Sequence, residues 1–145
     1  MKIHRIDHVG VIVNDLSAAK AFFLDFGLEL QGEGEIDGEW VDRIVGLKHV
    51  KAAYVMLRAP DGQANIELVK FYRPSDENDI QQPAANTLGI RHIAFAVDDI
   101  EAVVAKLKNK GTELVGEIQT YEDSYKLCYI RGPEGIILEL AEQLK

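Results

Sequence analysis

IDHVGVIVNDLSAAKAFFLDFGLEL, residues 6–30, has a second copy along the chain in IRHIAFAVDDIEAVVAKLKNKGTEL, residues 90–114. The two stretches align without a gap at a constant offset of 84 residues. Most positions keep their apolar or polar character, and the identical pairs include His8/His92, Val13/Val97, Asp15/Asp99 and Gly27/Gly111. A repeat of this length predicts that the chain contains two copies of one supersecondary unit.

Each copy begins with the pattern of a strand and continues with that of a helix. The short apolar runs Val9–Val13 and Ile93–Val97 are rich in β-branched residues, which is typical of mostly buried strands. Asp15 and Asp99 then offer side-chain oxygens as helix N-caps. Apolar residues follow at helical spacing, and glycine at 27 and 111 suits a helix C-cap.

Three further strands are expected in each copy. They are residues 28–30, 52–57 and 64–71 in the first half, and 113–118, 125–131 and 136–141 in the second. The turn signals at residues 60–62 and 132–135 occupy corresponding places between the last two strands. The chain is therefore expected to be one α+β domain over residues 1–145, with two tandem βαβββ modules at about 3–72 and 89–143 and a linker at about 73–88.

Composition and charge exclude several classes of protein. The chain is 47% hydrophobic and 28% charged, like an ordinary globular protein, and its net charge of −8 disfavours nucleic acid and anionic membrane surfaces as partners. No apolar run approaches the length of a membrane span. The single cysteine, Cys128, lies in an apolar run and is expected to be a buried thiol in a reducing compartment. We expect a cytoplasmic protein.

The duplication also supplies each half with one histidine and one glutamate. Ile66-Glu67-Leu68 in the last strand of the first half matches Leu138-Glu139-Leu140 in the second, and His8 matches His92. Taken alone, each residue has an ordinary explanation, because a strand glutamate usually faces solvent and a strand histidine is often half-buried and hydrogen-bonded. Together, two imidazoles and two carboxylates at matched positions would neutralise a divalent cation. The pattern therefore predicts a metal site.

With these motifs, and with the strand NIELVKF and the strand-turn-strand KLCYIRGPEGIILEL, nearly the whole chain resembles the vicinal oxygen chelate superfamily, the glyoxalase, bleomycin-resistance and extradiol-dioxygenase group. The resemblance implies two βαβββ modules forming a cupped, mostly antiparallel sheet around one divalent metal, often in a homodimer. It also implies the metal ligands His8, Glu67, His92 and Glu139, with Ni, Co, Zn, Mn or Fe as the ion.

This ligand set looks most like that of glyoxalase I. There the metal chelates adjacent oxygens of a small substrate, and a ligand carboxylate also moves a proton. The resemblance thus implies a metal-dependent isomerase or lyase, similar to lactoylglutathione lyase, with Glu67 and Glu139 as the catalytic residues. Either glutamate can be the base.

The chain departs from bacterial glyoxalase I where glutathione-recognising residues align. Ile12 stands in place of an arginine and Phe71 in place of an asparagine, which argues against glutathione as cosubstrate. Two alternatives remain open. One is an epimerase of the methylmalonyl-CoA epimerase type on another substrate, and the other is a non-enzymatic binding protein like the bleomycin-resistance proteins.

Five further residues are candidates for contact with the substrate. They are Trp40, Arg43, Tyr54, Arg58 and Lys126. Arg43 is the first choice, because a guanidinium binds a carboxylate or phosphate through two hydrogen bonds. Trp40 can equally be a core residue, and Arg43 or Lys126 a solvated surface charge.

Overall fold

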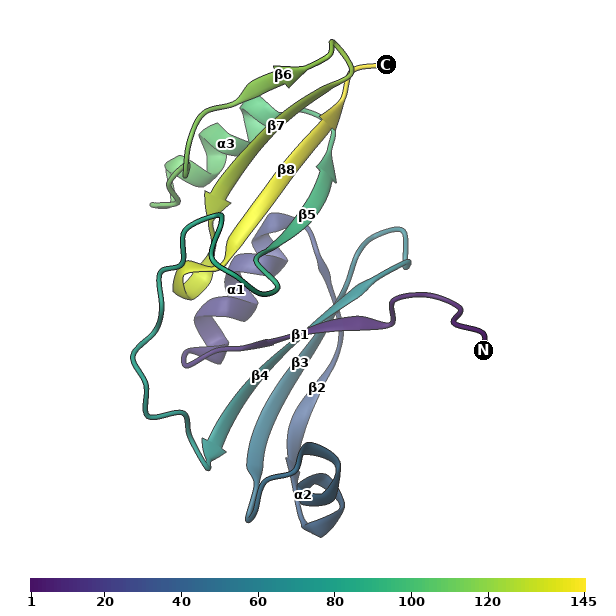
Figure 1. Ribbon diagram of the computed structural model, residues 1–145, viewed down its shortest axis with the longest axis vertical. Helices are drawn as coiled ribbons and strands as arrows, with labels where there is room; N and C mark the ends of the chain where they lie inside the picture. The colour runs from purple at the N-terminus through teal and green to yellow at the C-terminus, as the bar shows by residue number, and fades with distance from the viewer. The chain divides into compact units, whose positions relative to one another are not determined.

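The computed structural model describes residues 1–145, which divide into two compact units, Met1–Asp79 and Ile80–Lys145. The boundary falls inside the segment expected to connect the modules. Each unit contains one four-stranded sheet, and Figure 1 gives the course of the chain through both. No helix in the chain is long and apolar enough to cross a membrane.

Unit 1 has the sheet order β1-β4-β3-β2. The strand β1 runs parallel to β4, and the other two pairings are antiparallel. Its elements are β1 (His8–Ile12), α1 (Leu16–Phe26), β2 (Glu29–Asp37), α2 (Glu39–Val45), β3 (Lys51–Arg58) and β4 (Asn65–Arg73).

Unit 2 repeats this topology with the order β5-β8-β7-β6 and a parallel β5–β8 pair. Its elements are β5 (His92–Val97), α3 (Ile100–Lys108), β6 (Gln119–Tyr121), β7 (Tyr125–Arg131), a short 3₁₀ turn η1 (Pro133–Gly135) and β8 (Ile137–Gln143). Two mixed sheets, each mostly antiparallel, with helices beside them make an α+β protein, as the sequence predicts.

One face of each sheet is covered by the helix that follows its first strand. In unit 1 the side chains of Ala19 and Phe23 on α1 are buried, as are Val55 on β3 and Leu68 on β4, which are paired neighbours. In unit 2 the residues facing α3 include the buried Cys128 and Leu140. Because strand side chains alternate between faces, the residues next to these along each strand project from the opposite face of the sheet.

The two capping aspartates confirm the expected helix starts. The side chain of Asp15 accepts the backbone N–H of Ala18, and that of Asp99 accepts the N–H of Ala102. Gly27 caps the end of α1 with φ +121°. The C-cap of α3 is instead Asn109, and Gly111 lies in the turn beyond it, so the second C-cap assignment is wrong.

The prediction of a strand at residues 113–118 is wrong. This segment has one isolated bridge, Leu114 to Ile130, and two backbone hydrogen bonds to β7, and it bends at Val115 and Gly116 before β6 begins. The matching place in unit 1 is a bulge between Leu30 and Gly32, after which β2 continues as a regular strand. At matching positions, the strand of unit 1 continues past a bulge, whereas the pairing in unit 2 is interrupted.

Helix α2 is an addition to the expected βαβββ order. Gly38 precedes it, Gly46 ends it in the left-handed conformation, and the side chain of Asp42 accepts the backbone N–H groups of His49 and Val50. Val41 packs in a small core with Val50, Ala52 and Val69. The helix thus covers part of the sheet face that α1 leaves free.

Candidate functional site

In unit 1 the strand register brings His8 and Glu67 together. Gly10 on β1 pairs with Glu67 on β4, and His8 pairs with Asn65 two residues earlier. Since residues two apart share a face, His8 and Glu67 project from the same side of the sheet. Their Nε2 and Oε1 atoms are 3.8 Å apart, and the side chains are 38% and 28% exposed.

Unit 2 reproduces this arrangement in the same register. Ala94 pairs with Glu139, and His92 pairs with Ile137. The Nε2 atom of His92 lies 3.2 Å from Oε1 of Glu139, and the glutamate side chain is 18% exposed. Both pairs occupy the face opposite to the one that α1 or α3 covers. The duplication therefore extends from the sequence to the geometry of each pair.

His8 is held by the residue before it. Nδ1 of His8 lies 2.8 Å from Oδ2 of Asp7, and this hydrogen bond is the main reason that the pKa of Asp7 is lowered. Arg5 donates to the other carboxylate oxygen of Asp7 at 3.2 Å. An imidazole that donates through Nδ1 has its lone pair on Nε2, the atom that faces Glu67. Sequence reasoning missed Asp7, although an acid directly before a ligand-type histidine is a usable signal.

His92 has different neighbours. The position matching Asp7 is Arg91, whose guanidinium donates to the carbonyls of Thr87 and Leu88, both at 2.9 Å. The ring of His92 instead lies beside that of Tyr129, with centroids 5.0 Å apart. Tyr129 pairs with Glu139 across β7 and β8. The two halves thus share their His–Glu pairs but differ in what surrounds them.

The face around the unit 1 pair has room for a ligand. A Cβ atom added to Gly10, the residue paired with Glu67, would meet nothing within 4 Å. Oδ1 of Asn65, the residue paired with His8, is buried without a hydrogen-bond partner. Buried acceptors are normally satisfied, so this oxygen is an exception that no donor of the chain resolves. Imidazole nitrogen and carboxylate oxygen also suit a divalent transition metal.

A second group of acidic residues has a different role. Asp99, Glu101 and Glu142 bring carboxylate oxygens within 4.8 Å of one another at the start of α3. Asp99 and Glu142 accept backbone N–H groups of α3, the latter from Ile100 at 2.8 Å, and Lys126 Nζ lies 2.7 Å from Glu101. The hydrogen bond between Lys126 and Glu101 raises the pKa of the lysine and lowers that of the glutamate. These carboxylates cap a helix and neutralise a lysine.

The substrate candidates divide between the two faces of their sheets. Tyr54 and Arg58 share the Glu67 face in unit 1. Tyr54 covers Gly34 and packs against the small core under α2, and Arg58 pairs with Glu29 at 3.3 Å. Lys126 lies on the α3 face of unit 2 with Glu101, so the structure does not bring it to the His92–Glu139 pair.

The two remaining candidates are exposed on α2. Trp40 is 58% exposed, and Arg43 forms an i,i+4 ion pair with Glu39 at 3.2 Å. Val41 of the same helix is buried on the Glu67 face, but Arg43 is paired with Glu39 and not with Glu67, whose ion pair is with His8.

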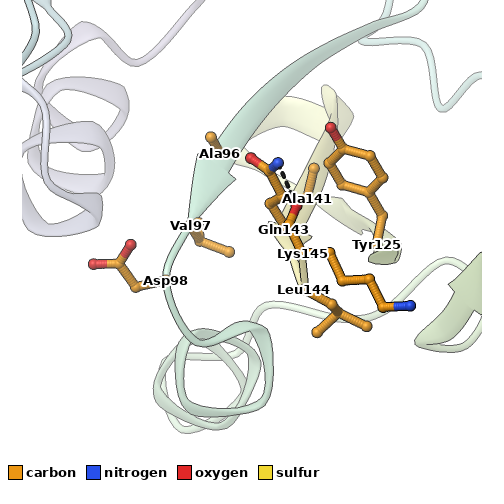
Figure 2. Close-up of a pocket in the computed structure, with 8 residues that line it drawn as sticks. All are labelled: Ala96, Val97, Asp98, Tyr125, Ala141, Gln143, Leu144 and Lys145. Atoms are coloured by element: carbon orange, nitrogen blue, oxygen red, sulfur yellow. Dashed lines mark hydrogen bonds between the residues drawn. The ribbon is translucent and has the colours of Figure 1, made fainter. Parts of the chain in front are cut away.

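Each unit has a cavity where its first and last strands end. In unit 1 a cavity of about 420 Å³ is lined by Ile12, Val13, Asn14, Leu47, Phe71, Pro74, Ser75 and Asp76. In unit 2 a cavity of about 680 Å³ is lined by Ala96, Val97, Asp98, Tyr125, Ala141, Gln143, Leu144 and Lys145. Figure 2 shows the residues that line the unit 2 cavity, among them Tyr125 and Gln143; the side chain of Gln143 donates to the carbonyl of Lys145 at 2.6 Å. Four lining positions correspond between the two cavities: Ile12/Ala96, Val13/Val97, Asn14/Asp98 and Phe71/Gln143. Only the cavity of unit 1 is mainly apolar.

Comparisons with known proteins agree with this architecture. A crystal structure of a glyoxalase family protein from Bacillus cereus matches with a TM-score of 0.95 and 42% identity, over 100% of this chain and 97% of that one. The uncharacterized protein YaeR of Escherichia coli (strain K12) is 30% identical over 97% of this chain and 98% of its own length. TnmS3, an antibiotic binding protein from Streptomyces sp. CB03234, shares the fold with a TM-score of 0.65 at 17% identity, covering 99% of this chain and 98% of that one.

The family model for these proteins matches almost the whole chain, over residues 5–140. Both His–Glu pairs lie within this range. The chain belongs to the Glyoxalase/Bleomycin resistance protein/Dioxygenase superfamily.

Proposed function

We propose that this protein is a metal-dependent enzyme of the glyoxalase I type, an isomerase or lyase that moves a proton on a small substrate with two adjacent oxygens. The observation that carries the proposal is the recurrence of one His–Glu pair in the same register of both sheets, at 3.8 Å and 3.2 Å. In this proposal His8, Glu67, His92 and Glu139 together hold one divalent ion.

The proposal assigns metal binding and proton transfer to particular residues. The two imidazoles supply neutral donors, and Asp7 orients that of His8. One glutamate, Glu67 or Glu139, takes the proton from the carbon next to the substrate carbonyl and returns it to the substrate. A divalent ion of the Ni, Co, Zn, Mn or Fe type would polarise the adjacent substrate oxygens and make that proton more acidic.

Metal content is the first test. Protein reconstituted with each of these ions should hold one per chain after dialysis, and a His8→Ala/His92→Ala variant should hold none, as measured by elemental analysis. The matched control is Glu101→Gln/Glu142→Gln, which removes the other acidic group and should keep the metal. A wild-type protein that takes up none of these ions, or a metal lost only in the control, would remove the basis of the proposal.

Proton transfer is the second test. Glu67→Gln and Glu139→Gln each keep an oxygen donor but lose the basic carboxylate. The metal-loaded variant of the base should lose about 10²–10⁴-fold in the rate of solvent deuterium incorporation next to the substrate carbonyl. The screen covers 2-hydroxy-aldehyde thioadducts, acyl-CoA thioesters and related vicinal-oxygen compounds. Exchange at the wild-type rate in both metal-loaded variants would contradict the assigned base.

A homodimer is part of the proposal. An isolated module leaves sheet edges and an incomplete binding face, which a partner chain can complete. Sedimentation at micromolar concentration should give a species of twice the 16.2 kDa chain mass. A purely monomeric protein would contradict it.

The second candidate is a binding protein without catalytic metal. The apolar cavity of unit 1 favours it, and TnmS3, a protein of the same fold, is described as an antibiotic binding protein. A sequestering protein needs the cavity but not the four metal donors. Tight binding of an apolar ligand by protein that takes up no metal would favour this candidate over the enzyme.

A further inference from the structure

The unit 1 cavity is connected to the His8–Glu67 pair by the strands themselves. Ile12 lies two residues beyond Gly10 on β1, and Phe71 lies four residues beyond Glu67 on β4, all on one face. At about 3.3 Å per strand residue, the two cavity walls begin roughly 7 Å and 13 Å from the Gly10–Glu67 row. A ligand with one end at Glu67 therefore needs only a short arm to reach the cavity.

The walls of this cavity are mostly apolar and partly open to a ligand. Ile12 is 59% exposed and Leu47 is 42% exposed, and Val13, Phe71 and Pro74 complete the apolar lining. The volume of about 420 Å³ is within the range of roughly 300–1,000 Å³ that holds small ligands.

Of the three polar residues in the lining, Ser75 and Asp76 are already engaged with their neighbours through their side chains. Ser75 Oγ donates to Glu77 at 2.9 Å, and Asp76 Oδ1 accepts from the backbone and side chain of Asn78 at 2.9 and 2.8 Å. The contribution left for a ligand is therefore chiefly apolar surface.

The cavity of unit 2 provides an internal comparison. At the positions of Ile12 and Phe71 it has Ala96 and Gln143, and Asp98 and Tyr125 add polar groups to its lining. An apolar group buried in the unit 1 cavity leaves water for contacts with aliphatic and aromatic side chains, whereas the same group in the unit 2 cavity would desolvate polar atoms.

We infer that the cavity lined by Ile12, Leu47 and Phe71 binds an apolar arm of the substrate, so that the substrate class is a chelating oxygen pair attached to an aliphatic or aromatic group. This inference rests on the proposed function, because the chelating end is taken to lie at the metal. It extends that function by assigning selectivity for the apolar part of the substrate to unit 1.

The probes are straight-chain alkyl hydroxamic acids of two to ten carbons, which carry two adjacent oxygens on an apolar tail of chosen length. Their dissociation constants are measured by calorimetry on metal-loaded and metal-free protein. With metal, affinity should change little for the tails too short to reach the cavity, and should then rise about three- to fourfold for each further methylene until the cavity is filled. Acetohydroxamic acid has no tail, so it should bind only through the metal.

The test variant is Ile12→Asn/Leu47→Ser, which makes two exposed cavity walls polar without emptying the core. It should lose most of the gain with tail length and bind acetohydroxamic acid as the wild type does. The matched control, Ala96→Asn, makes the corresponding change in unit 2 and should leave the gain intact.

The possible results separate the two proposals. Acetohydroxamic acid that binds metal-loaded protein, with affinity independent of tail length for the longer probes, would overturn the apolar arm and leave the proposed function standing. Failure of acetohydroxamic acid to bind metal-loaded protein would count against the proposed function. A gain with tail length that Ala96→Asn abolishes and the unit 1 variant retains would assign the arm to the other cavity and overturn the inference.

Discussion

Oδ2 of Asp7 lies 2.8 Å from Nδ1 of His8, on the opposite side of the imidazole from Glu67. A carboxylate in this position fixes both the tautomer and the orientation of the ring. No such partner is available to His92, because the matching residue is Arg91. The two histidine rings therefore differ in how firmly they are held.

Replacing Asp7 by asparagine should weaken metal binding by about 10- to 100-fold, the typical effect of losing a carboxylate behind a ligating histidine. The affinity is measured by competition with a chelator of known strength. The matched control is Arg5→Gln, which removes the other partner of Asp7 and should change affinity little, because exposed ion pairs contribute little. Equal losses in both variants would contradict the orienting role of Asp7.

The core under α1 should depend strongly on Phe23. This side chain is 1% exposed, so Phe23→Ala should reduce the free energy of unfolding by about 3–5 kcal/mol, as measured by urea denaturation. Leu24 on the same helix is 37% exposed, and Leu24→Ala should cost less than about 1 kcal/mol. Similar costs at the two positions would show that α1 is not packed by the face described.

The pair of Lys126 and Glu101 makes a prediction about pH. The hydrogen bond from Lys126 lowers the pKa of Glu101 below its ordinary value of 4.5, so this carboxylate stabilises the folded chain at neutral pH and loses that effect as pH falls through the lowered pKa. Glu101→Gln should make the loss of stability between about pH 5 and pH 3 less steep, as measured by denaturation at each pH. Glu122→Gln, in an exposed turn, provides the control. An unchanged slope in Glu101→Gln would contradict the assignment.

The thiol of Cys128 should react slowly in the folded protein. It is 4% exposed, and burial raises its pKa, so little thiolate is available near neutral pH. Reaction with a chromogenic disulfide should be more than about tenfold slower than in the urea-unfolded chain. Equal rates would mean that β7 opens readily to solvent.

The sequence predicts the topology well because strands and helices each leave a characteristic spacing of apolar side chains. The strand Tyr125–Arg131 has the expected bounds, and both helix starts follow from a capping aspartate. The placement of His8 with Glu67 also follows from the strand register. His8 pairs with Asn65, and Glu67, two residues further along β4, projects from the same face as Asn65.

Features without a local signal were not predicted. Helix α2 has only seven residues, too few for its apolar spacing to stand out, although Gly38 and Gly46 mark its ends. The cavity of unit 1 depends on how residues 47 and 74–76 pass beside β1 and β4, which no periodicity in the sequence encodes. The bend at Gly116 likewise depends on how the chain meets β7.

Both histidines lie on strands with a single hydrogen-bonded neighbour in their sheet, while both glutamates lie on interior strands. Fraying of β1 or β5 would therefore carry a histidine away and leave the glutamate in place. In the proposed metal site, an ion bound by both residues would hold the two strands of the parallel pair together, so its dissociation and the amide hydrogen exchange of the outer strand would be linked. The lifetime of such an ion would then depend on the opening of an outer strand as well as on the strength of its ligands.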